Sequence, residues 1–222
     1  MEIVANHVST PRKEMLEFIS NIPKTSLEIG CIEGLFSETL KNIYKNIEVW
    51  GIEPNEKVNK EICKQNLDYF FQDFFPLKND KLPEKYFDLI ILNDVLEHMY
   101  DPWMALEECK KLLTDDGIII VSLPNIRHKS VVKKLLFQND FKYEDSGILD
   151  ITHIRFFTTK TMISMFTKAE LEIVKMKPLV SKKPLFKRII HSYKIIFHIL
   201  TFYKFYSMRY GQYGFTLKNK KI

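Results

Sequence analysis

The chain has 222 residues, of which 45% are hydrophobic and 27% are charged, as in an ordinary globular protein. That length suits one domain with a sizeable core and excludes fibrous and disordered classes. The net charge of +5 is uneven, because residues 181–222 hold ten Lys or Arg and no acid, which leaves −5 for residues 1–180. A basic tail on an acidic body does not suit nucleic-acid binding, which favours a basic patch over a domain.

The cysteines and the first residues indicate the compartment. The chain has three cysteines, Cys31, Cys63 and Cys109, and no two of them form a Cys-x-x-Cys pair. An odd number without this spacing favours buried thiols in a reducing cytoplasm over disulfides or a zinc site. Residues 1–7 do not combine a basic stretch with an apolar one, and no apolar run approaches the roughly 18 residues of a membrane span. We therefore expect a cytoplasmic protein.

Apolar periodicity predicts one α/β domain over residues 1–222. An amphipathic helix at Arg12–Ser20 precedes alternating strands and helices. The expected strands are Ser26–Cys31, Val49–Ile52, Tyr69–Asp73, Phe87–Asn93, Ile118–Leu123, Leu171–Met176 and Gly214–Leu217. The expected helices are Phe36–Tyr44, Glu56–Gln65, Pro102–Leu113 (capped by Asp101) and Thr159–Lys168. Strands joined by helical crossovers predict a doubly wound parallel sheet, and the last strand, too near the chain end for a crossover, should be antiparallel.

The first two strand ends carry residues suited to a nucleotide-like ligand. The first strand runs into Glu28–Gly34, a glycine-bearing turn that lets the backbone approach a ligand at the carboxyl edge of the sheet. The second strand ends at Glu53, which lies 23 residues after Gly30. A carboxylate at that point can accept hydrogen bonds from both hydroxyls of a ribose.

The third and fourth strands end in the same way. Asp73 can accept an adenine amino proton, and Phe74 can stack on the base. The fourth strand ends at Asn93, five residues before His98. Each signal is weak alone, but four of them at successive strand ends indicate one nucleotide-binding edge.

The segment Phe-Asp-Leu-Ile-Ile-Leu-Asn-Asp-Val-Leu-Glu-His at residues 87–98, followed by Asp101-Pro102, is the most specific motif. With the strand ends above, it resembles the class I S-adenosylmethionine-dependent methyltransferases, especially the bacterial small-molecule branch of the ubiquinone-biosynthesis type. The resemblance covers roughly residues 13–177. It implies a Rossmann-like sheet of seven strands with the last antiparallel, and S-adenosyl-L-methionine as cofactor. The cofactor residues it implies are Glu28, Gly30, Ile32 and Gly34 for the methionine part, Glu53 and Pro54 for the ribose, Asp73 and Phe74 for the adenine, and Asn93 facing the cofactor.

Ile32 departs from the family pattern, which has glycine at the middle of the turn. A β-branched residue at positive φ is an outlier that costs about 1–2 kcal/mol. Either the turn is rebuilt, or cofactor binding is weakened. A non-catalytic binding or partner subunit on the same fold is therefore the alternative to an enzyme.

Methyl transfer asks little of the protein, because the sulfonium methyl is already electrophilic and positioning supplies most of the acceleration. A base is needed for a hydroxyl or a protonated amine. His98 and His153 are the candidates for this role, although a structural role is also open for each. The sequence shows no clustered metal site, so no metal is expected.

The methyl acceptor is expected to be a small molecule, and a sugar or surface-glycan precursor is suggested by the Thr-His-Ile-Arg-Phe-Phe segment at residues 152–157. A nicotinamide oxidoreductase is disfavoured, because the chain has neither Gly-x-Gly-x-x-Gly nor a second βαβαβ half. Nucleic-acid methylation is disfavoured because Asn93 is not followed by the two prolines of amino-methylating enzymes. The acceptor site is expected under the segment Val131–Ile154.

The basic tail is expected to form an amphipathic helical insert at about residues 183–211, before the last strand. Read as a helix, it has a narrow polar stripe and a broad apolar face with interspersed lysines. Packing back on the sheet or forming a homodimer is one reading. Docking at the inner, anionic membrane surface is the other.

Overall fold

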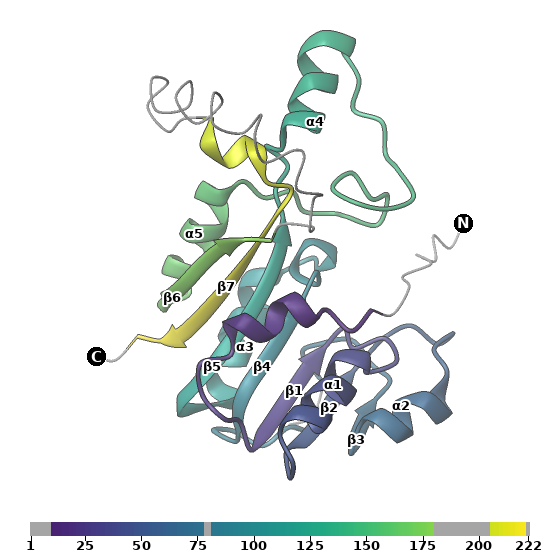
Figure 1. Ribbon diagram of the computed structural model, residues 1–222, viewed down its shortest axis with the longest axis vertical. Helices are drawn as coiled ribbons and strands as arrows, with labels where there is room; N and C mark the ends of the chain where they lie inside the picture. The colour runs from purple at the N-terminus through teal and green to yellow at the C-terminus, as the bar shows by residue number, and fades with distance from the viewer. Residues whose placement is uncertain (1–9, 78–80, 180–204, 221–222) are drawn as a thin grey trace.

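The computed structural model describes residues 10–77, 81–179 and 205–220, and these form a seven-stranded sheet with the order β3-β2-β1-β4-β5-β7-β6 (Figure 1). The strands are β1 (Thr25–Ile29), β2 (Glu48–Ile52), β3 (Tyr69–Phe71), β4 (Phe87–Asn93), β5 (Leu113–Pro124), β6 (Leu171–Pro178) and β7 (Gln212–Asn219). β7 pairs antiparallel with both β5 and β6, whereas the pairs among β1 to β5 are parallel. The predicted fold class and the antiparallel last strand are confirmed.

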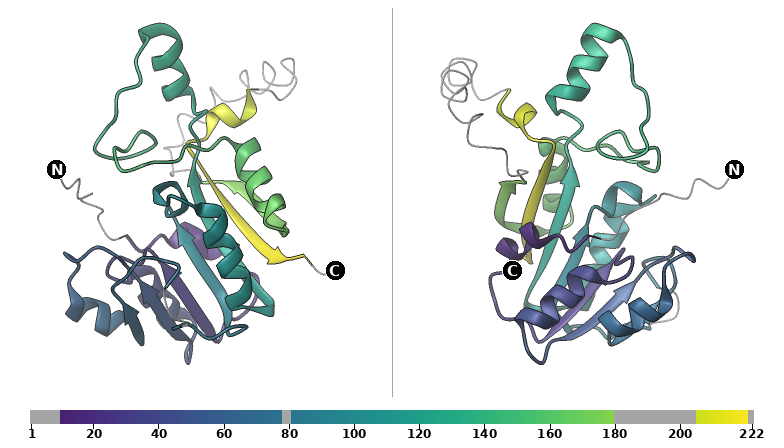
Figure 2. Two further views of the ribbon diagram at one scale, coloured as in Figure 1. Left: turned by 180° about the vertical axis from the view of Figure 1, so that it is seen from behind. Right: turned by 45° about the vertical axis from the view of Figure 1, so that its right-hand side comes forward.

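Helices cover both faces of the sheet. They are α1 (Leu35–Ile43), α2 (Lys60–Asn66), α3 (Pro102–Leu112), α4 (Lys129–Lys133) and α5 (Thr159–Lys168), with a 3-10 helix, η1, at Lys13–Phe18. Residues of η1, α1 and α2 pack in one buried cluster, and residues of α3 and α5 pack in the other. Figure 1 shows the face of the sheet that η1, α1 and α2 cover, and the left view of Figure 2 shows α3 and α5 in front of the opposite face.

β4 shows why the sequence makes this two-sided sheet. Leu89 and Ile91 lie in the cluster on the α1 side, whereas Ile90 and Leu92 lie in the cluster on the α3 side, and all four are fully buried. Successive side chains of a strand point to opposite faces. A continuous apolar run therefore suits a strand that helices cover on both sides.

Two predicted helices are wrong at their ends. The helix expected at Arg12–Ser20 is only the 3-10 helix Lys13–Phe18, because Arg12 is left-handed with φ 39° and Ile19 is extended. The helix expected from Glu56 begins at Lys60 instead. The side chain of Asn59 caps α2 by accepting hydrogen bonds from the backbone N–H groups of Glu61 and Ile62, which fixes the start of a helix more strongly than apolar spacing.

Several strands also differ in length from the prediction. β3 stops at Phe71, before the expected Asp73, and β7 extends beyond Gly214–Leu217 at both ends. β5 begins at Leu113, and the expected turn at Asp116 and Gly117 is an irregularity within it: Phe87 pairs with Leu113, but Leu89 pairs with Ile118. A bulge of this kind lets a strand continue past residues that have no partner.

An arm (residues 126–148) leaves the carboxyl end of β5. It holds α4 and a further helical turn, η3 (Lys134–Gln138), that ends at the left-handed residue Asn139. Figure 1 and both views of Figure 2 show α4 projecting from the edge of the sheet that is formed by the carboxyl ends of the parallel strands. Most of the predicted insert at 183–211 lies outside the described residues, whose last part begins with the 3-10 helix η4 (Tyr206–Arg209). Within the described residues, no helix has the length and apolar character needed to cross a bilayer.

Candidate functional site

The turn after β1 brings the backbone close to the end of β4. Gly30 has φ 71°, and a Cβ atom added there would lie 2.7 Å from Cγ2 of Val95. Gly34 has φ 73° and caps the start of α1. A left-handed glycine with no room for a side chain marks a point of close backbone approach, so both predicted glycines are required by the geometry of this turn.

Ile32 adopts the backbone conformation that the family pattern reserves for glycine, with φ 50°. Its N–H donates to Oε2 of Glu53 over 2.9 Å, and its carbonyl accepts from the thiol of Cys63 at 3.4 Å. Its side chain is half-buried and packs against the cluster on the α1 side. The turn is therefore not rebuilt around Ile32, and the strain of the left-handed conformation remains.

Replacing Ile32 by glycine should tighten cofactor binding. The substitution removes a β-branched side chain from the turn that must meet the ligand, so the turn can adjust to the cofactor. Relief of the left-handed strain, about 1–2 kcal/mol, stabilises the free protein as well. Calorimetry with S-adenosylmethionine measures the change in dissociation constant. A matched control is Glu170→Gly, because Glu170 is also left-handed, with φ 56°, but follows α5 and lies outside the turn. Equal affinities of Ile32→Gly and wild type would show that the turn is already adapted to isoleucine.

Two buried acids support this turn from different sides. Glu53 is 7% exposed, and its Oε1 accepts from the backbone N–H of Asn55 at 2.9 Å while Oε2 holds Ile32. Glu28 accepts from the backbone N–H of Ser37 at 3.2 Å and from its hydroxyl at 2.6 Å. Burial raises the pKa of Glu28 to about 7, against the opposing effect of the Ser37 hydrogen bonds. Glu28 thus braces the first turn of α1, and Glu53 joins the end of β2 to the turn after β1.

The residues after β3 are more open. Oδ1 of Asp73 accepts from the backbone N–H of Phe74 at 2.8 Å, and Oδ2 lies 3.6 Å from Nζ of Lys81. The Phe74 side chain is 74% exposed, so its ring is available to a planar ligand. Pro54 is half-buried beside Glu53.

Asn93, at the end of β4, has a side-chain amide whose nitrogen and oxygen atoms are buried. Neither its Oδ1 nor its Nδ2 makes a hydrogen bond within the described residues. An unsatisfied buried amide costs about 1–3 kcal/mol per group and calls for an explanation such as a bound ligand. The predicted role of Asn93 toward the cofactor fits this observation.

Arg12 is a member of the site that sequence reasoning missed. Its Nη1 pairs with Oδ2 of Asp94, its Nη2 donates to the hydroxyl of Ser122 at 3.1 Å, and Nε2 of Gln212 donates to Oδ1 of Asp94. Arg12 therefore spans the ends of β4 and β5. Arg12 and Asp94 are both left-handed, with φ 39° and φ 56°. This backbone conformation accompanies the contact, but it cannot be read from the sequence.

The two predicted histidines lie together. The rings of His98 and His153 are 4.7 Å apart between centroids in an edge-to-face arrangement. Nδ1 of His98 lies 3.1 Å from both the carbonyl and the hydroxyl oxygen of Thr152, and that hydroxyl donates its proton to Asp150. Both oxygens can therefore only accept, so Nδ1 of His98 carries the proton and Nε2 is the basic nitrogen.

His153 is more enclosed than His98. It is 7% exposed, its Nδ1 faces the carbonyl of Ile148 at 3.1 Å, and its Nε2 lies 3.9 Å from Oε1 of Glu97. By the same argument Nδ1 is protonated and Nε2 faces the carboxyl. This geometry favours His98 as the base and His153 as a residue that positions it.

Glu97 completes this cluster, and sequence reasoning did not single it out. It is fully buried, and neither carboxyl oxygen has a hydrogen-bond partner among the described residues. Burial, and then the charge of Asp94, raise its pKa well above the ordinary value. Glu97, His98 and His153 each have one possible metal-ligand atom, and these three atoms lie within 4.8 Å of one another. Among the residues that the structure describes, this group could hold a metal ion, whereas the sequence led us to expect no metal.

An aromatic wall stands beside the histidines. Phe156 is 6.3 Å from His153 and 5.5 Å from Phe141 between ring centroids, and Phe141 contacts Tyr143 of the arm at 5.8 Å. Phe157 is 5% exposed and belongs to the core. The segment expected to cover the acceptor site thus contributes Phe141 and Tyr143, which pack on Phe156 beside His153.

Comparison with known proteins agrees with this geometry. A family model described as a methyltransferase domain matches residues 5–176. A ubiquinone biosynthesis O-methyltransferase of Actinobacillus pleuropneumoniae serotype 5b is 33% identical over 111 residues, which are 46% of this chain and 46% of that protein. The chain spans about half the length of the curated relatives it matches.

Solved structures share the fold. A SAM-dependent methyltransferase from Archaeoglobus fulgidus has a TM-score of 0.59 at 19% identity, covering 93% of this chain and 90% of that one. A SAM-dependent methyltransferase from Thermotoga maritima, described as a possible histamine N-methyltransferase, has a TM-score of 0.60 at 18% identity, covering 94% and 86%. The resemblance inferred from the strand-end motifs is therefore confirmed, and the chain belongs to the methyltransferase domain family.

Proposed function

We propose that this protein transfers the methyl group of S-adenosylmethionine to a hydroxyl group of a small molecule. The observation that carries the proposal is the hydrogen bond from the N–H of Ile32 to the buried carboxylate of Glu53. It joins the turn after β1 to the end of β2, the two places that hold the ends of a nucleoside ligand in such sheets.

The residues present fit this cofactor. Gly30 gives the turn after β1 the left-handed conformation that lets its backbone pass close to Val95, and Asn93 offers an amide with unused donors and an acceptor. Glu53 would accept from the ribose hydroxyls, and Asp73 with Phe74 would bind the adenine. When bound, S-adenosylmethionine supplies an electrophilic methyl group, and the protein's part is to hold and orient the acceptor.

His98 supports a hydroxyl acceptor, because its Nε2 is the basic nitrogen and can take the hydroxyl proton. The aromatic wall of Phe141, Tyr143 and Phe156 suits an acceptor with an apolar body. The named relatives act as O-methyltransferases in ubiquinone biosynthesis, which supports O-methylation, whereas none of these relatives supports the sugar or glycan acceptor expected from the sequence.

Calorimetry with S-adenosylmethionine and S-adenosylhomocysteine tests the cofactor, and transfer of a labelled methyl group tests the acceptor. We expect binding of both and labelling of a hydroxylated ubiquinone precursor ahead of nucleotide sugars. Absence of cofactor binding would favour the non-catalytic subunit that Ile32 suggested. Binding without transfer to any hydroxyl would leave the cofactor assignment standing and overturn the acceptor class.

We also propose that the basic tail, which the sequence places at about 183–211, associates with the cytoplasmic membrane face. The charge of residues 181–222 supports attraction to anionic lipid. Flotation of the full chain with anionic vesicles should succeed at low salt and fade as salt rises. If the protein does not float and light scattering gives a dimer, packing between copies explains the apolar face instead.

A further inference from the structure

The turn formed by residues 31–34 contains a residue that is poorly suited to it. The N–H of Gly34 donates to the carbonyl of Cys31 at 2.7 Å and closes the turn, whose first central residue is Ile32 with φ 50°. Gly, Asn and Asp usually fill such a position, because a β-branched side chain disfavours positive φ. Other contacts must therefore hold Ile32 in this conformation.

Partners on both sides of Ile32 fix its backbone angles. Its N–H is held by Glu53 at the end of β2, and its carbonyl is held by the thiol of Cys63 in α2. The angles φ and ψ are the two soft rotations of a residue, and they separate its N–H from its carbonyl. Holding both groups therefore leaves Ile32 little freedom to return to negative φ.

The helix α2 also holds the next carbonyl of the turn. Nδ2 of Asn66, which is 8% exposed, donates to the carbonyl of Glu33 at 2.8 Å. A thiol is a weak donor, so the amide of Asn66 makes the stronger of the two contacts. Cys63 and Asn66 together are called the α2 clamp below.

The end of α2 can reach the turn because Gly34 has no side chain. A Cβ atom added to Gly34 would lie 3.0 Å from Cγ of Leu67 and 3.2 Å from Cβ of Asn66. The start of α2 is fixed by the Asn59 cap, and Cys63 and Leu67 pack in the buried cluster on the α1 side of the sheet. The end of α2 is thus packed directly against the turn.

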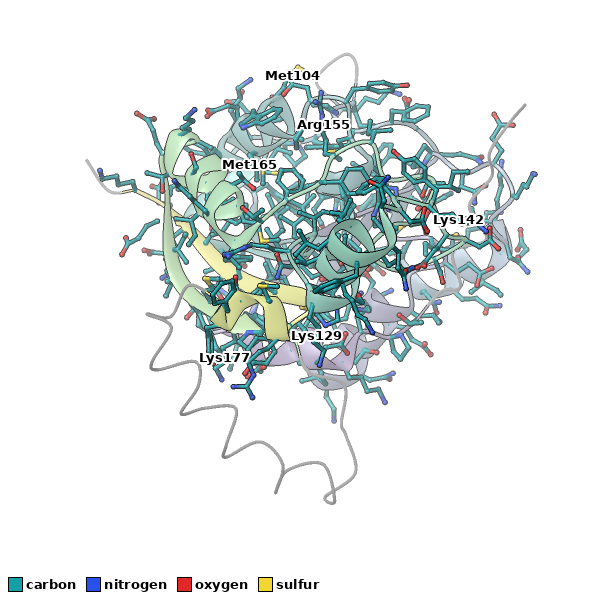
Figure 3. The ribbon with its side chains drawn as sticks, turned by 90° about the horizontal axis from the view of Figure 1, so that it is seen from above. Met104, Lys129, Lys142, Arg155, Met165 and Lys177 are labelled. Atoms are coloured by element: carbon teal, nitrogen blue, oxygen red, sulfur yellow. The ribbon has the colours of Figure 1, made fainter. Side chains whose placement is uncertain are left out.

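The α2 clamp and a ligand reach the turn from different sides. The turn lies at the carboxyl edge of the sheet, which Figure 3 shows from above with Lys129 and Lys142 of the arm in view. Cys63 is fully buried and Asn66 is buried as well, so neither side chain is open to a ligand at this edge. The α2 clamp can therefore influence cofactor binding only through the turn.

We propose that the α2 clamp positions the turn for S-adenosylmethionine and replaces the conformational freedom that glycine provides in the family pattern. The inference rests on the proposed function, because it takes S-adenosylmethionine as the ligand of the turn. Without the α2 clamp, Ile32 relaxes toward negative φ, and only a fraction of the molecules hold the turn in the required conformation. The apparent affinity falls by that fraction, whereas a glycine at this position needs no such support.

A double-mutant cycle in the full chain tests the proposal. Asn66→Ala should weaken S-adenosylmethionine binding about tenfold, or about 1.4 kcal/mol, which is the size of the strain that a left-handed residue carries. In the Ile32→Gly background the same substitution should weaken binding less than about twofold, because the turn no longer needs support. Calorimetry measures the dissociation constants.

Two controls separate positioning of the turn from general damage to α2. Asn59→Ala removes the cap of α2 but leaves both contacts of the α2 clamp in place, so its effect on affinity should be equal in the two backgrounds. Cys63→Ala should weaken binding when Ile32 is present, and Cys63→Ser, which keeps a hydrogen-bond donor, should restore it.

Amide hydrogen exchange of the free protein provides a readout that needs no cofactor. The N–H groups of Ile32 and Gly34 are hydrogen-bonded in the turn, so Asn66→Ala should speed their exchange about tenfold by opening the turn locally. In the Ile32→Gly background the same substitution should leave the exchange rates of these two positions unchanged.

Equal effects of Asn66→Ala in both backgrounds, in affinity and in exchange, would overturn the α2 clamp. Background dependence in exchange but not in affinity would overturn its role toward the cofactor. If the wild-type protein binds no S-adenosylmethionine but its exchange depends on the α2 clamp as expected, the cofactor assignment falls while the support of the turn stands.

Discussion

Replacing Glu53 by alanine should weaken S-adenosylmethionine binding by about one to two orders of magnitude, which corresponds to roughly 1.5–3 kcal/mol for hydrogen bonds to a charged group. The carboxylate would accept from the ribose, and it already holds the backbone N–H groups of Ile32 and Asn55. Its loss therefore removes a ligand contact and loosens the turn. Isothermal titration calorimetry measures the effect.

Two further variants separate these contributions. Glu53→Gln keeps one carbonyl acceptor without the charge and should fall between wild type and Glu53→Ala. Glu48→Ala is the control, because Glu48 begins the same strand and its carboxylate holds Trp50 and Tyr86 at the other end of β2. Wild-type affinity in Glu53→Ala would remove Glu53 from the cofactor site.

Replacing His98 by alanine should lower turnover by at least about tenfold, at the low end of what a positioned general base contributes. The hydrogen bonds of Asp150, Thr152 and His98 fix the proton on Nδ1 of His98, so Nε2 is the basic nitrogen that would take the acceptor proton. His153→Ala should lower turnover less and should alter the pH dependence, because His153 contacts both the ring of His98 and the buried carboxyl of Glu97. Single-turnover rates with labelled cofactor measure both.

The affinity for S-adenosylmethionine provides the control for these variants. It should change little in either histidine variant, because the predicted cofactor contacts lie at other residues. If both variants retain the wild-type rate, the protein acts through proximity alone, and the histidines have a packing role.

The sequence by itself determined the sheet and the positions of the strand-end residues. β4 and α5 have the predicted bounds, and Asp101 caps α3 by accepting from the N–H of Met104 at 2.9 Å. These features depend on neighbours within a few residues, namely a continuous apolar run, a cap or a proline. The carboxyl ends of parallel strands meet at one edge, so the order of the strands alone predicts that Glu53, Asp73 and Asn93 lie at the same edge.

Only the tertiary structure decided the contacts between distant segments. Arg12 meets Asp94, 82 residues away, and His98 meets Thr152, 54 residues away; neither pair has a local pattern. The left-handed conformation of Ile32 is set by hydrogen bonds with Glu53 and Cys63, which outweigh its own preference for negative φ. The sequence thus specified which residues stand at the edge, and long-range hydrogen bonding and burial decided which of them touch.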